Sequence, residues 1–198
     1  LYTHGIIVKC KSSWNTPLLP MHKSNGEYRP VQDLRVVNKA TVAIHATVPN
    51  PYTMLGQIPA DATWFTCLDL KNAFFCLRLS PQNQPIFAFQ WGQSQYTWTR
   101  LPQGFKNSPT IFEEALATDL EALRNLVTIV CYYNTLLILL FAALRREECL
   151  QGRKRLHHLL CEAGYKVSKD KAKQVCFREV RYLGFMVSQG QGRLERAR

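Results

Sequence analysis

Residues 128–144 read TIVCYYNTLLILLFAAL, a run of seventeen residues without a charged side chain. A helix that crosses a bilayer needs about 20 predominantly apolar residues, so this run is at the lower limit, and the polar tetrapeptide YYNT interrupts it at 132–135. A polar turn between two apolar runs is typical of a β-hairpin. We therefore expect two buried antiparallel strands joined at YYNT, and we do not expect the chain to cross a membrane.

The residues before this hairpin predict a helix. The loop LPQGFKNSPT at 101–110 ends in Ser108 and Pro109, and serine at the N-cap followed by proline at the first helical position is a common helix start. Apolar residues then recur at helical spacing: Phe112, Leu116, Leu120 and Leu123.

The residues after the hairpin predict a second helix and a closing strand. The helix is expected over about 146–163, with Gly164 ending it. Its inward residues are expected to be Leu156, Leu159 and Leu160. The sequence VRYLGFMV at 180–187 is expected to form one strand that closes the chain.

The first half of the chain consists of shorter pieces. The sequence KSNGEYR at 23–29 has a turn signature between extended segments, and IFAFQW at 86–91 with YTWTRL at 96–101 predicts paired strands around the turn GQSQ. Residues 64–79, WFTCLDLKNAFFCLRL, mix aromatic and apolar residues with a single carboxylate, Asp69. The whole order of elements predicts an α+β fold in which helices cover a small antiparallel sheet.

Composition indicates a folded protein with a polyanionic partner. Hydrophobic residues make up 46% of the 198 and charged residues 20%, which is typical of a globular chain. The formal net charge is +11, and residues 145–198 carry +8 of it, with 14 basic and six acidic residues. Such an excess favours nucleic-acid binding because phosphate neutralisation releases counterions. A solvated basic surface without a partner is the alternative.

The cysteine pattern indicates reduced thiols. The seven cysteines form no C-x-x-C pair and the histidines show no metal-ligand spacing, which argues against a zinc module and for an intracellular, cytoplasmic setting. The chain has no signal peptide and does not begin with Met, and we expect it to be a fragment of a longer protein.

Asp69 is the residue that composition alone does not explain. A carboxylate between Leu68 and Leu70 in an apolar strand costs free energy unless it is paired or binds a metal ion. Taken alone, a half-buried aspartate satisfied by backbone donors explains the residue slightly better than a metal ligand does.

Nine ordered segments bear on this choice. They read WNTPLLP, YRPVQDLR, VNK, TVPNPY, LDLKNAFFCLRL, FAF, TWTRLPQGFKNSPT, GYKVSKDKA and YLGF. In these segments and their order the chain closely resembles retroviral reverse transcriptases of the gammaretroviral, murine-leukaemia-virus type, including endogenous proviral relatives. The resemblance covers nearly all 198 residues and implies the fingers and palm of a right-hand polymerase. It places the fingers at about 1–60 and 80–110 and the palm at 61–79 and 111–198 of a single domain fragment, with the thumb, connection and ribonuclease H regions absent.

The resemblance also implies a two-metal site that this chain keeps only in part. The family holds two Mg²⁺ ions with one strand aspartate, matched by Asp69, and with an adjacent aspartate pair at a hairpin tip in the motif Tyr-x-Asp-Asp. Here that motif reads Tyr132-Tyr133-Asn134-Thr135, so that Asn134 and Thr135 stand at the positions of the pair. We expect Asp69 to be the one remaining metal ligand and the chain to be catalytically inactive.

Further residues match positions that contact substrate in the family. By resemblance, Lys23 and Arg29 bind the incoming deoxynucleoside triphosphate, and Gln103 and Phe105 belong to a loop that contacts it. Phe74 matches the aromatic that excludes a ribose 2′ hydroxyl, and Asn72 stands where the murine type has a second aspartate. Core packing is the alternative role for both phenylalanines.

The resemblance implies primer–template contacts near the end of the chain. The turn Tyr182-Leu183-Gly184-Phe185 matches the primer-gripping turn, and a run of lysines is expected to lie against duplex backbone: Lys166, Lys169, Lys171 and Lys173. A solvated lysine face is the alternative for this run.

Three functions remain open on the sequence. The first is a reverse transcriptase (RNA-directed DNA polymerase, a nucleotidyltransferase) domain of an endogenous retroviral Pol polyprotein, inactive by substitution, with primer–template, nucleotide and the other Pol regions as partners. The second is a non-catalytic nucleic-acid-binding module. The third is a proviral relic without selected function.

Overall fold

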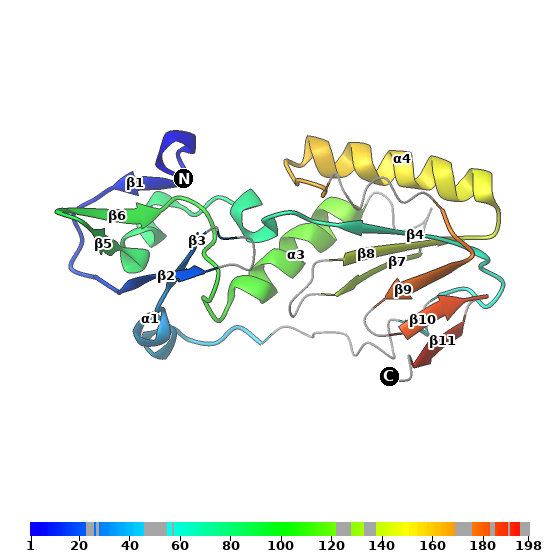
Figure 1. Cartoon of the computed structure of the whole chain (residues 1–198), viewed down its shortest axis with the longest axis horizontal. Helices are drawn as coiled ribbons and strands as arrows, with labels where there is room; N and C mark the ends of the chain where they lie inside the picture. The colour runs from blue at the N-terminus through cyan, green and yellow to red at the C-terminus, as the bar shows by residue number, and fades with distance from the viewer. Residues whose placement is uncertain are drawn as a thin grey trace. The chain divides into compact units, whose positions relative to one another are not determined.

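The computed structural model describes residues 1–22, 26, 28–45, 55–56, 58–121, 128–132, 138–168, 176–182, 185–189 and 191–194. The chain divides into two compact units. The first comprises Leu1–Ala46 and Phe74–Phe112, and the second comprises Thr47–Ala73 and Glu113–Arg198. Each unit therefore takes chain segments from both halves of the sequence (Figure 1).

A three-stranded antiparallel sheet organises the first unit. Its order is β1 (Ile7–Lys9), β6 (Ser94–Trp98) and β5 (Phe89–Trp91), with Ile7 opposite Trp98 and Phe89 opposite Tyr96. The predicted pairing of IFAFQW with YTWTRL is confirmed for Phe89–Trp91, whereas Pro85–Phe87 form a 3-10 helix, and the turn is the two residues Gly92-Gln93 instead of GQSQ. Gly92 has a φ of 60°, which two-residue hairpin turns require and glycine adopts without strain.

A β-hairpin and short helices complete this unit. The hairpin pairs β2 (Leu18–His22) with β3 (Tyr28–Gln32), as the turn signature between them predicted. It is followed by α1 (Arg35–Ala40). Four short 3-10 helices also occur in the described residues: η1 (Tyr2–His4), η2 (Ala73–Cys76), η3 (Pro81–Asn83) and η4 (Pro85–Phe87).

A buried amide joins the hairpin to the sheet. Trp98 donates its indole N–H to Gln32 Oε1 at 2.6 Å, and Gln32 Nε2 donates to the Phe87 carbonyl at 2.9 Å and to Thr16 Oγ1 at 2.6 Å. Gln32 is 6% exposed. A buried amide costs free energy unless its hydrogen bonds are made, and these three bonds therefore fix the base of the hairpin against β6.

The predicted hairpin at 128–144 forms the centre of the second unit. Its strands are β7 (Thr128–Tyr132) and β8 (Ile138–Ala143), and β8 also pairs with β4 (Trp64–Asp69) in the order β4-β8-β7. The prediction of two antiparallel strands is confirmed. The connection at 133–137 lies outside the described residues.

The helix α3 spans Ser108–Leu120 and begins one residue before the predicted first helical position, Pro109. The predicted N-cap role of Ser108 is wrong, because its hydroxyl donates to the Pro102 carbonyl at 2.7 Å. The Asn107 carbonyl accepts the first helical hydrogen bond, from Ile111 N at 3.0 Å. The Ser108 hydroxyl thus makes its hydrogen bond to the preceding loop and not to the first turn of the helix.

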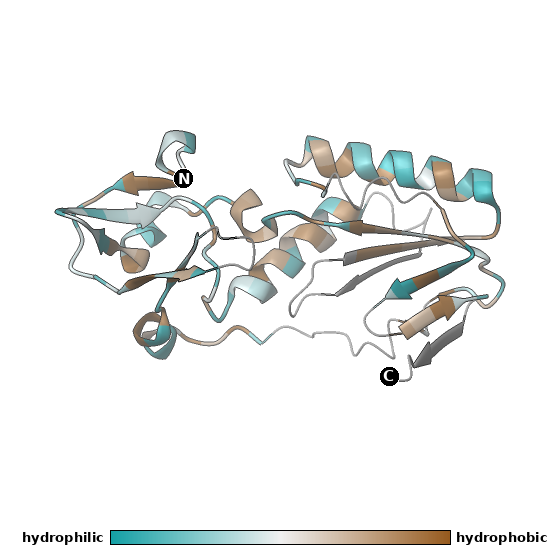
Figure 2. Cartoon of the chain, in the orientation of Figure 1, coloured by the Kyte–Doolittle hydropathy of each residue, from teal (hydrophilic) through white to brown (hydrophobic). Residues whose placement is uncertain are grey.

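The helix α4 spans Arg146–Glu162 and packs on β8 and β4. Leu156 and Leu160 are fully buried, while Leu159 is half-buried, and Gly164 follows the helix with a φ of 85°. The predicted bounds and the predicted glycine stop are confirmed. Hydrophilic and hydrophobic residues alternate along α4 while β4 and β8 are mostly hydrophobic (Figure 2), as expected for a helix with one buried face.

The end of the chain differs from the sequence prediction. The segment predicted as one closing strand forms two antiparallel strands, β9 (Glu179–Tyr182) and β10 (Phe185–Ser188), which are followed by β11 (Gln191–Leu194). The prediction of a single strand is wrong because Val180 and Val187 both face the core, which a straight strand cannot achieve for residues an odd number apart.

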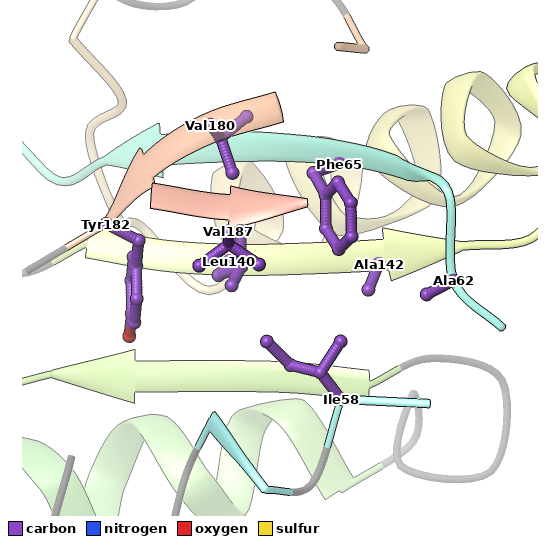
Figure 3. Close-up of a cluster of buried hydrophobic side chains, with 8 residues drawn as sticks. All are labelled: Ile58, Ala62, Phe65, Leu140, Ala142, Val180, Tyr182 and Val187. Atoms are coloured by element: carbon purple, nitrogen blue, oxygen red, sulfur yellow. The ribbon is translucent and has the colours of Figure 1, made fainter. Parts of the chain in front are cut away.

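The core of the second unit gathers where these strands meet. It contains eight buried residues (Figure 3): Ile58, Ala62, Phe65, Leu140, Ala142, Val180, Tyr182 and Val187. Burial of such side chains contributes about 1.5–3 kcal/mol each relative to exposure. The cluster therefore ties β4 and β8 to the β9–β10 pair.

No helix in the described part of the chain is long and apolar enough to cross a membrane. Six cysteines of the same part form no disulfide, and Cys149 and Cys176 among them are buried.

Candidate functional site

Asp69 ends β4, where the segment 166–168 of the second unit approaches it. Its carbonyl accepts a hydrogen bond from Ser168 N at 2.8 Å, and Lys71 N donates to the Lys166 carbonyl at 2.6 Å. An isolated antiparallel bridge joins Leu70 to Val167. Asp69 is half-buried, so its side chain lies at the edge of the sheet and not in the middle of the core.

The strand register places Asp69 at the end of the sheet where the YYNT connection leaves it. Ile138, the first residue of β8, pairs with Asp69 on one side and with Tyr132, the last residue of β7, on the other. The end of the β7–β8 pair at Tyr132 and Ile138 therefore lies beside the end of β4. Asn134 and Thr135 belong to this connection and lie outside the described residues.

The donor set at this end of the sheet does not fit a pair of divalent ions. Mg²⁺ is held mainly by carboxylate oxygens, and the connection at 133–137 contains no acidic residue. Within the described ranges, no three of the His, Cys, Asp and Glu side chains form a group that could hold a metal ion. Asp69 is thus the carboxylate that the described strand register brings to this place.

The turn after Asp69 contains an unusual backbone conformation. Asn72 has a φ of 52°, in the left-handed region that asparagine tolerates better than most other non-glycine residues. Asparagine at this position is therefore compatible with the turn that connects β4 to η2.

In the first unit, the predicted nucleotide-contacting loop is partly exposed. Gln103 is exposed, whereas Phe105 is 7% exposed and packs edge-to-face on Phe87 with 5.0 Å between ring centroids. Phe74 is half-buried and packs edge-to-face on Phe112 at 5.7 Å. Both phenylalanines thus make core contacts, as the alternative role foresaw, and the substrate role remains a prediction.

Two asparagines that the sequence did not single out hold this loop. Asn38 Nδ2 donates to the Gly104 carbonyl at 3.0 Å, and Asn38 Oδ1 accepts from Lys106 N at 2.9 Å. Asn107 Nδ2 donates to the Val42 carbonyl at 2.9 Å, and its Oδ1 accepts from Ile44 N at 3.1 Å. The signal in the sequence was an asparagine within each of the segments VNK and GFKNSPT, but only the fold shows what they bind.

Many of the residues predicted to contact primer, template or triphosphate lie outside the described part of the chain. Lys23, Lys169, Lys171, Lys173, Leu183 and Gly184 lie outside the described residues, as does the side chain of Arg29. Tyr182 is described and is fully buried in the core cluster of the second unit. A role of Tyr182 in gripping a primer would therefore rest on its backbone and on its neighbours.

The positive charge is spread over both units. The segments of the first unit contain nine basic and two acidic residues, a net charge of +7, and those of the second contain 16 and 12, a net charge of +4. Asp33, one of the two acids of the first unit, is bound by the Arg35 guanidinium at 2.6 Å. The first unit thus offers a positive field to a polyanion.

Comparison with known proteins decides the family. The family model described as reverse transcriptase (RNA-dependent DNA polymerase) matches residues 21–187. The chain belongs to the reverse transcriptase family. It is 51% identical to the Gag-Pol polyprotein of gibbon ape leukemia virus over 204 residues, which covers 98% of this chain and 12% of that polyprotein. It is 50% identical to the Pol polyprotein of feline endogenous virus ECE1, covering 96% of this chain and 19% of the relative.

Solved reverse transcriptases share the fold. Foamy viral protease–reverse transcriptase structures in complex with double-stranded DNA and with an RNA/DNA hybrid match with TM-scores of 0.84 and 0.83, at 33% and 32% identity and over 98% of this chain. The matched regions are 33% and 25% of those longer chains. The predicted gammaretroviral resemblance and the α+β fingers-and-palm fold of a right-hand polymerase are confirmed.

Proposed function

We propose that this reverse transcriptase domain of retroviral Pol type comes from an endogenous provirus and no longer polymerises DNA. The observation that carries the proposal is the place of Asp69 beside a connection without an acidic residue. Divalent-metal dependence is general in the family, and two ions stabilise the attacking and leaving oxygens of phosphoryl transfer. One carboxylate here stands where the family uses three.

The electrostatic loss is large. Replacing the aspartate pair by Asn134 and Thr135 removes two negative charges from a site that would face two divalent cations. Unit charges at 4 Å interact by about 4 kcal/mol at an effective dielectric constant of 20. An amide or a hydroxyl can touch a metal ion but brings no charge to offset this, so that the site should not bind both ions.

We assign the fingers to about 1–60 and 80–110 and the palm to 61–79 and 111–198. The division into two compact units supports this assignment in outline, although the unit boundaries at residues 46, 73 and 112 differ from it in detail. On this assignment Lys23, Arg29, Gln103 and Phe105 would contact the nucleotide from the fingers, and Phe74 would contact it from the palm.

Primer extension tests the loss of activity. The 198-residue chain is incubated with a poly-rA template, an oligo-dT primer and thymidine triphosphate, with Mg²⁺ and separately with Mn²⁺. We expect no incorporation, and template-dependent incorporation that is lost in Asp69→Asn would contradict the proposal.

Restoring the acids tests its cause. The double variant Asn134→Asp with Thr135→Asp should gain Mn²⁺ binding in isothermal titration, because Tyr132 and Ile138, which flank the connection, lie in the same sheet as Asp69, with Ile138 opposite it. The variant with Asp69→Asn added serves as the matched control and should lose that gain. No gain in the double variant would mean that the two substitutions do not account for the loss.

A retained function in nucleic-acid binding is the second candidate. The net charge of +11 and the complexes of the foamy viral relatives with double-stranded DNA and an RNA/DNA hybrid favour it. We expect salt-sensitive binding of a primer–template, with weaker affinity and a smaller salt slope after Lys169, Lys171 and Lys173 are changed to Gln. Lys154→Gln, an exposed change on α4, is the control.

The third possibility, a relic without selected function, predicts a chain that does not fold. Cooperative thermal unfolding with a near-ultraviolet dichroism signal would exclude a molten chain, and the packed cluster around Phe65 and Tyr182 leads us to expect it.

A further inference from the structure

A groove of about 420 Å³ lies in the first unit, between the β1–β6–β5 sheet and one face of the β2–β3 hairpin. Six aromatic residues give it its character, and we call it the aromatic groove: Tyr2, Tyr28, Phe89, Trp91, Tyr96 and Trp98. Its volume lies within the range of about 300–1,000 Å³ that ligand-binding clefts occupy.

The aromatic groove has a rigid floor and exposed walls. Phe89 and Trp98 form the floor, since they are 2% and 3% exposed and Trp98 is held by its bond to Gln32. Tyr2, Tyr28 and Trp91 form the walls and are 55%, 61% and 56% exposed. Such a gathering of large exposed aromatic side chains marks a binding surface on a soluble protein more often than chance exposure does.

Proline contributes to the same surface. Pro20 and Pro30 line the aromatic groove and stand opposite each other across the β2–β3 pair. Neither residue has a backbone N–H, so neither offers a hydrogen bond to an added strand at this point. A ligand here is therefore recognised by ring stacking and side-chain donors, not by strand addition.

The lining disfavours a nucleic-acid strand as occupant. None of the lining side chains is charged, whereas proteins that bind single strands combine stacking aromatics with Lys and Arg side chains along the phosphates. None of the basic residues of the unit is among the lining residues. An uncharged ligand segment with negative charge beyond its ends matches this distribution.

We propose that the aromatic groove binds a proline-rich peptide segment in the polyproline II conformation, flanked by acidic residues. Grooves walled by Tyr, Trp and Pro suit this ligand because its rings stack on aromatic faces and its conformation is formed before binding. Its backbone carbonyls make no internal hydrogen bonds, and Tyr hydroxyls and the Trp91 indole N–H are donors for them. The net charge of +7 on the first unit selects acidic flanks.

Peptide binding to the 198-residue chain tests this. The probe is a fluorescein-labelled peptide of sequence EEPPLPPEE, measured by fluorescence anisotropy. The first comparison peptide has glycine at every proline position, and the second has lysine in place of each glutamate. We expect saturable binding of the probe, at least tenfold weaker binding of the glycine peptide, and weaker binding of the lysine peptide that approaches the probe at high salt.

Variants assign the binding to the groove. Trp91→Ala and Tyr28→Ala should each weaken the probe about tenfold or more, as truncation of an aromatic anchor does. Both side chains are more than half exposed, so the midpoint of thermal unfolding should stay within a few degrees of the parent. Val42→Ala, at an 85% exposed position outside the groove, is the matched control and should bind as the parent does.

Three outcomes would overturn the proposal. They are the absence of saturable binding, equal affinity for the proline and glycine peptides, and unchanged affinity in both aromatic variants. A labelled oligothymidylate serves as the competing probe. If it binds more tightly than the peptide and Trp91→Ala weakens it, the groove is a base-stacking surface and the peptide proposal is wrong.

Discussion

Gly152 lies in the middle of α4, the helix that packs on β4 and β8. A Cβ atom built on Gly152 would lie 1.9 Å from Phe141 Cζ and 2.2 Å from Phe141 Cε2. Ordinary contacts between carbon atoms are about 3.5–4.0 Å. The Gly152→Ala variant therefore requires the ring or the helix to move by more than 1 Å.

The Phe141 ring has little room to move. It is 3% exposed, and it belongs to β8, which is paired on both sides, with Thr66 of β4 and with Ile129 of β7. Overpacking of a core typically costs about 1–3 kcal/mol. The gain in helix propensity from Gly to Ala is about 0.8–1.0 kcal/mol. With a clash at the severe end of the range, we expect a net loss of about 1–2 kcal/mol.

Chemical denaturation with circular dichroism detection measures this change, and a loss of this size lowers the unfolding temperature by about 2–8 °C for a chain of this length. Gln151→Ala, at the exposed neighbouring position, controls for propensity. The double variant Gly152→Ala with Phe141→Leu should recover part of the loss relative to Phe141→Leu alone. A Gly152→Ala variant as stable as the parent, or more stable, would refute the reasoning, because helix propensity alone predicts a gain.

Three further predictions concern other sites. Burial, and then the neighbouring Glu114, raises the pKa of Glu113, whose Oε2 is buried without a hydrogen bond from the described residues. A raised carboxyl pKa destabilises the ionised folded state, so Glu113→Gln should increase the free energy of unfolding at pH 7, and the gain should shrink as the pH falls and wild-type Glu113 becomes protonated. The hydrogen bonds from Arg35 lower the pKa of Asp33 to about 2. Their contribution to the stability of the fold should therefore be complete above the ordinary carboxyl pKa and should be lost as the pH falls through 2. Carbon-detected NMR titration of Asp33 in the parent and in Arg35→Gln, where its pKa should rise toward normal, checks this. Asn107→Ala removes the hydrogen bonds of this side chain to Val42 and Ile44 and should lower the free energy of unfolding by about 1–3 kcal/mol. The Ile44 amide should then exchange faster with solvent, and unchanged exchange there would show that Asn107 does not hold this segment.

Much of the candidate site could be predicted from the sequence. The apolar runs around YYNT predicted the strands β7 and β8, and the lone carboxylate in 64–79 drew attention to Asp69, because burial and turn chemistry are local properties. The order of the motifs gave the family, and with it the expectation that Asn134 and Thr135 replace two metal ligands. The register in which Ile138 pairs with Asp69 and Tyr132 required the folded sheet, because strand pairing joins residues about 70 positions apart.

Other features were hidden for a similar reason. The sequence does not distinguish Asn38 and Asn107 from other polar residues, because their hydrogen-bond partners are backbone groups that carry no sequence signal. Their role is visible only in the folded chain, where these backbone groups lie within reach of the two side chains. The buried amide of Gln32 and the hydroxyl of Ser108 likewise find partners in distant segments. In each case the local pattern allowed several partners, and only the tertiary structure selected one.

The sequence by itself determined the helix bounds, the hairpins around 23–29 and 128–144, and the family, because hydrophobic periodicity, turn residues and ordered motifs act over a few positions. Only the tertiary structure decided where β9 ends and β10 begins, that Gly152 meets Phe141, and that six aromatic residues from η1 and three strands line one groove with β1 and β2. Side chains of distant segments share a surface only after the chain has folded, and their contacts depend on packing that no local pattern specifies.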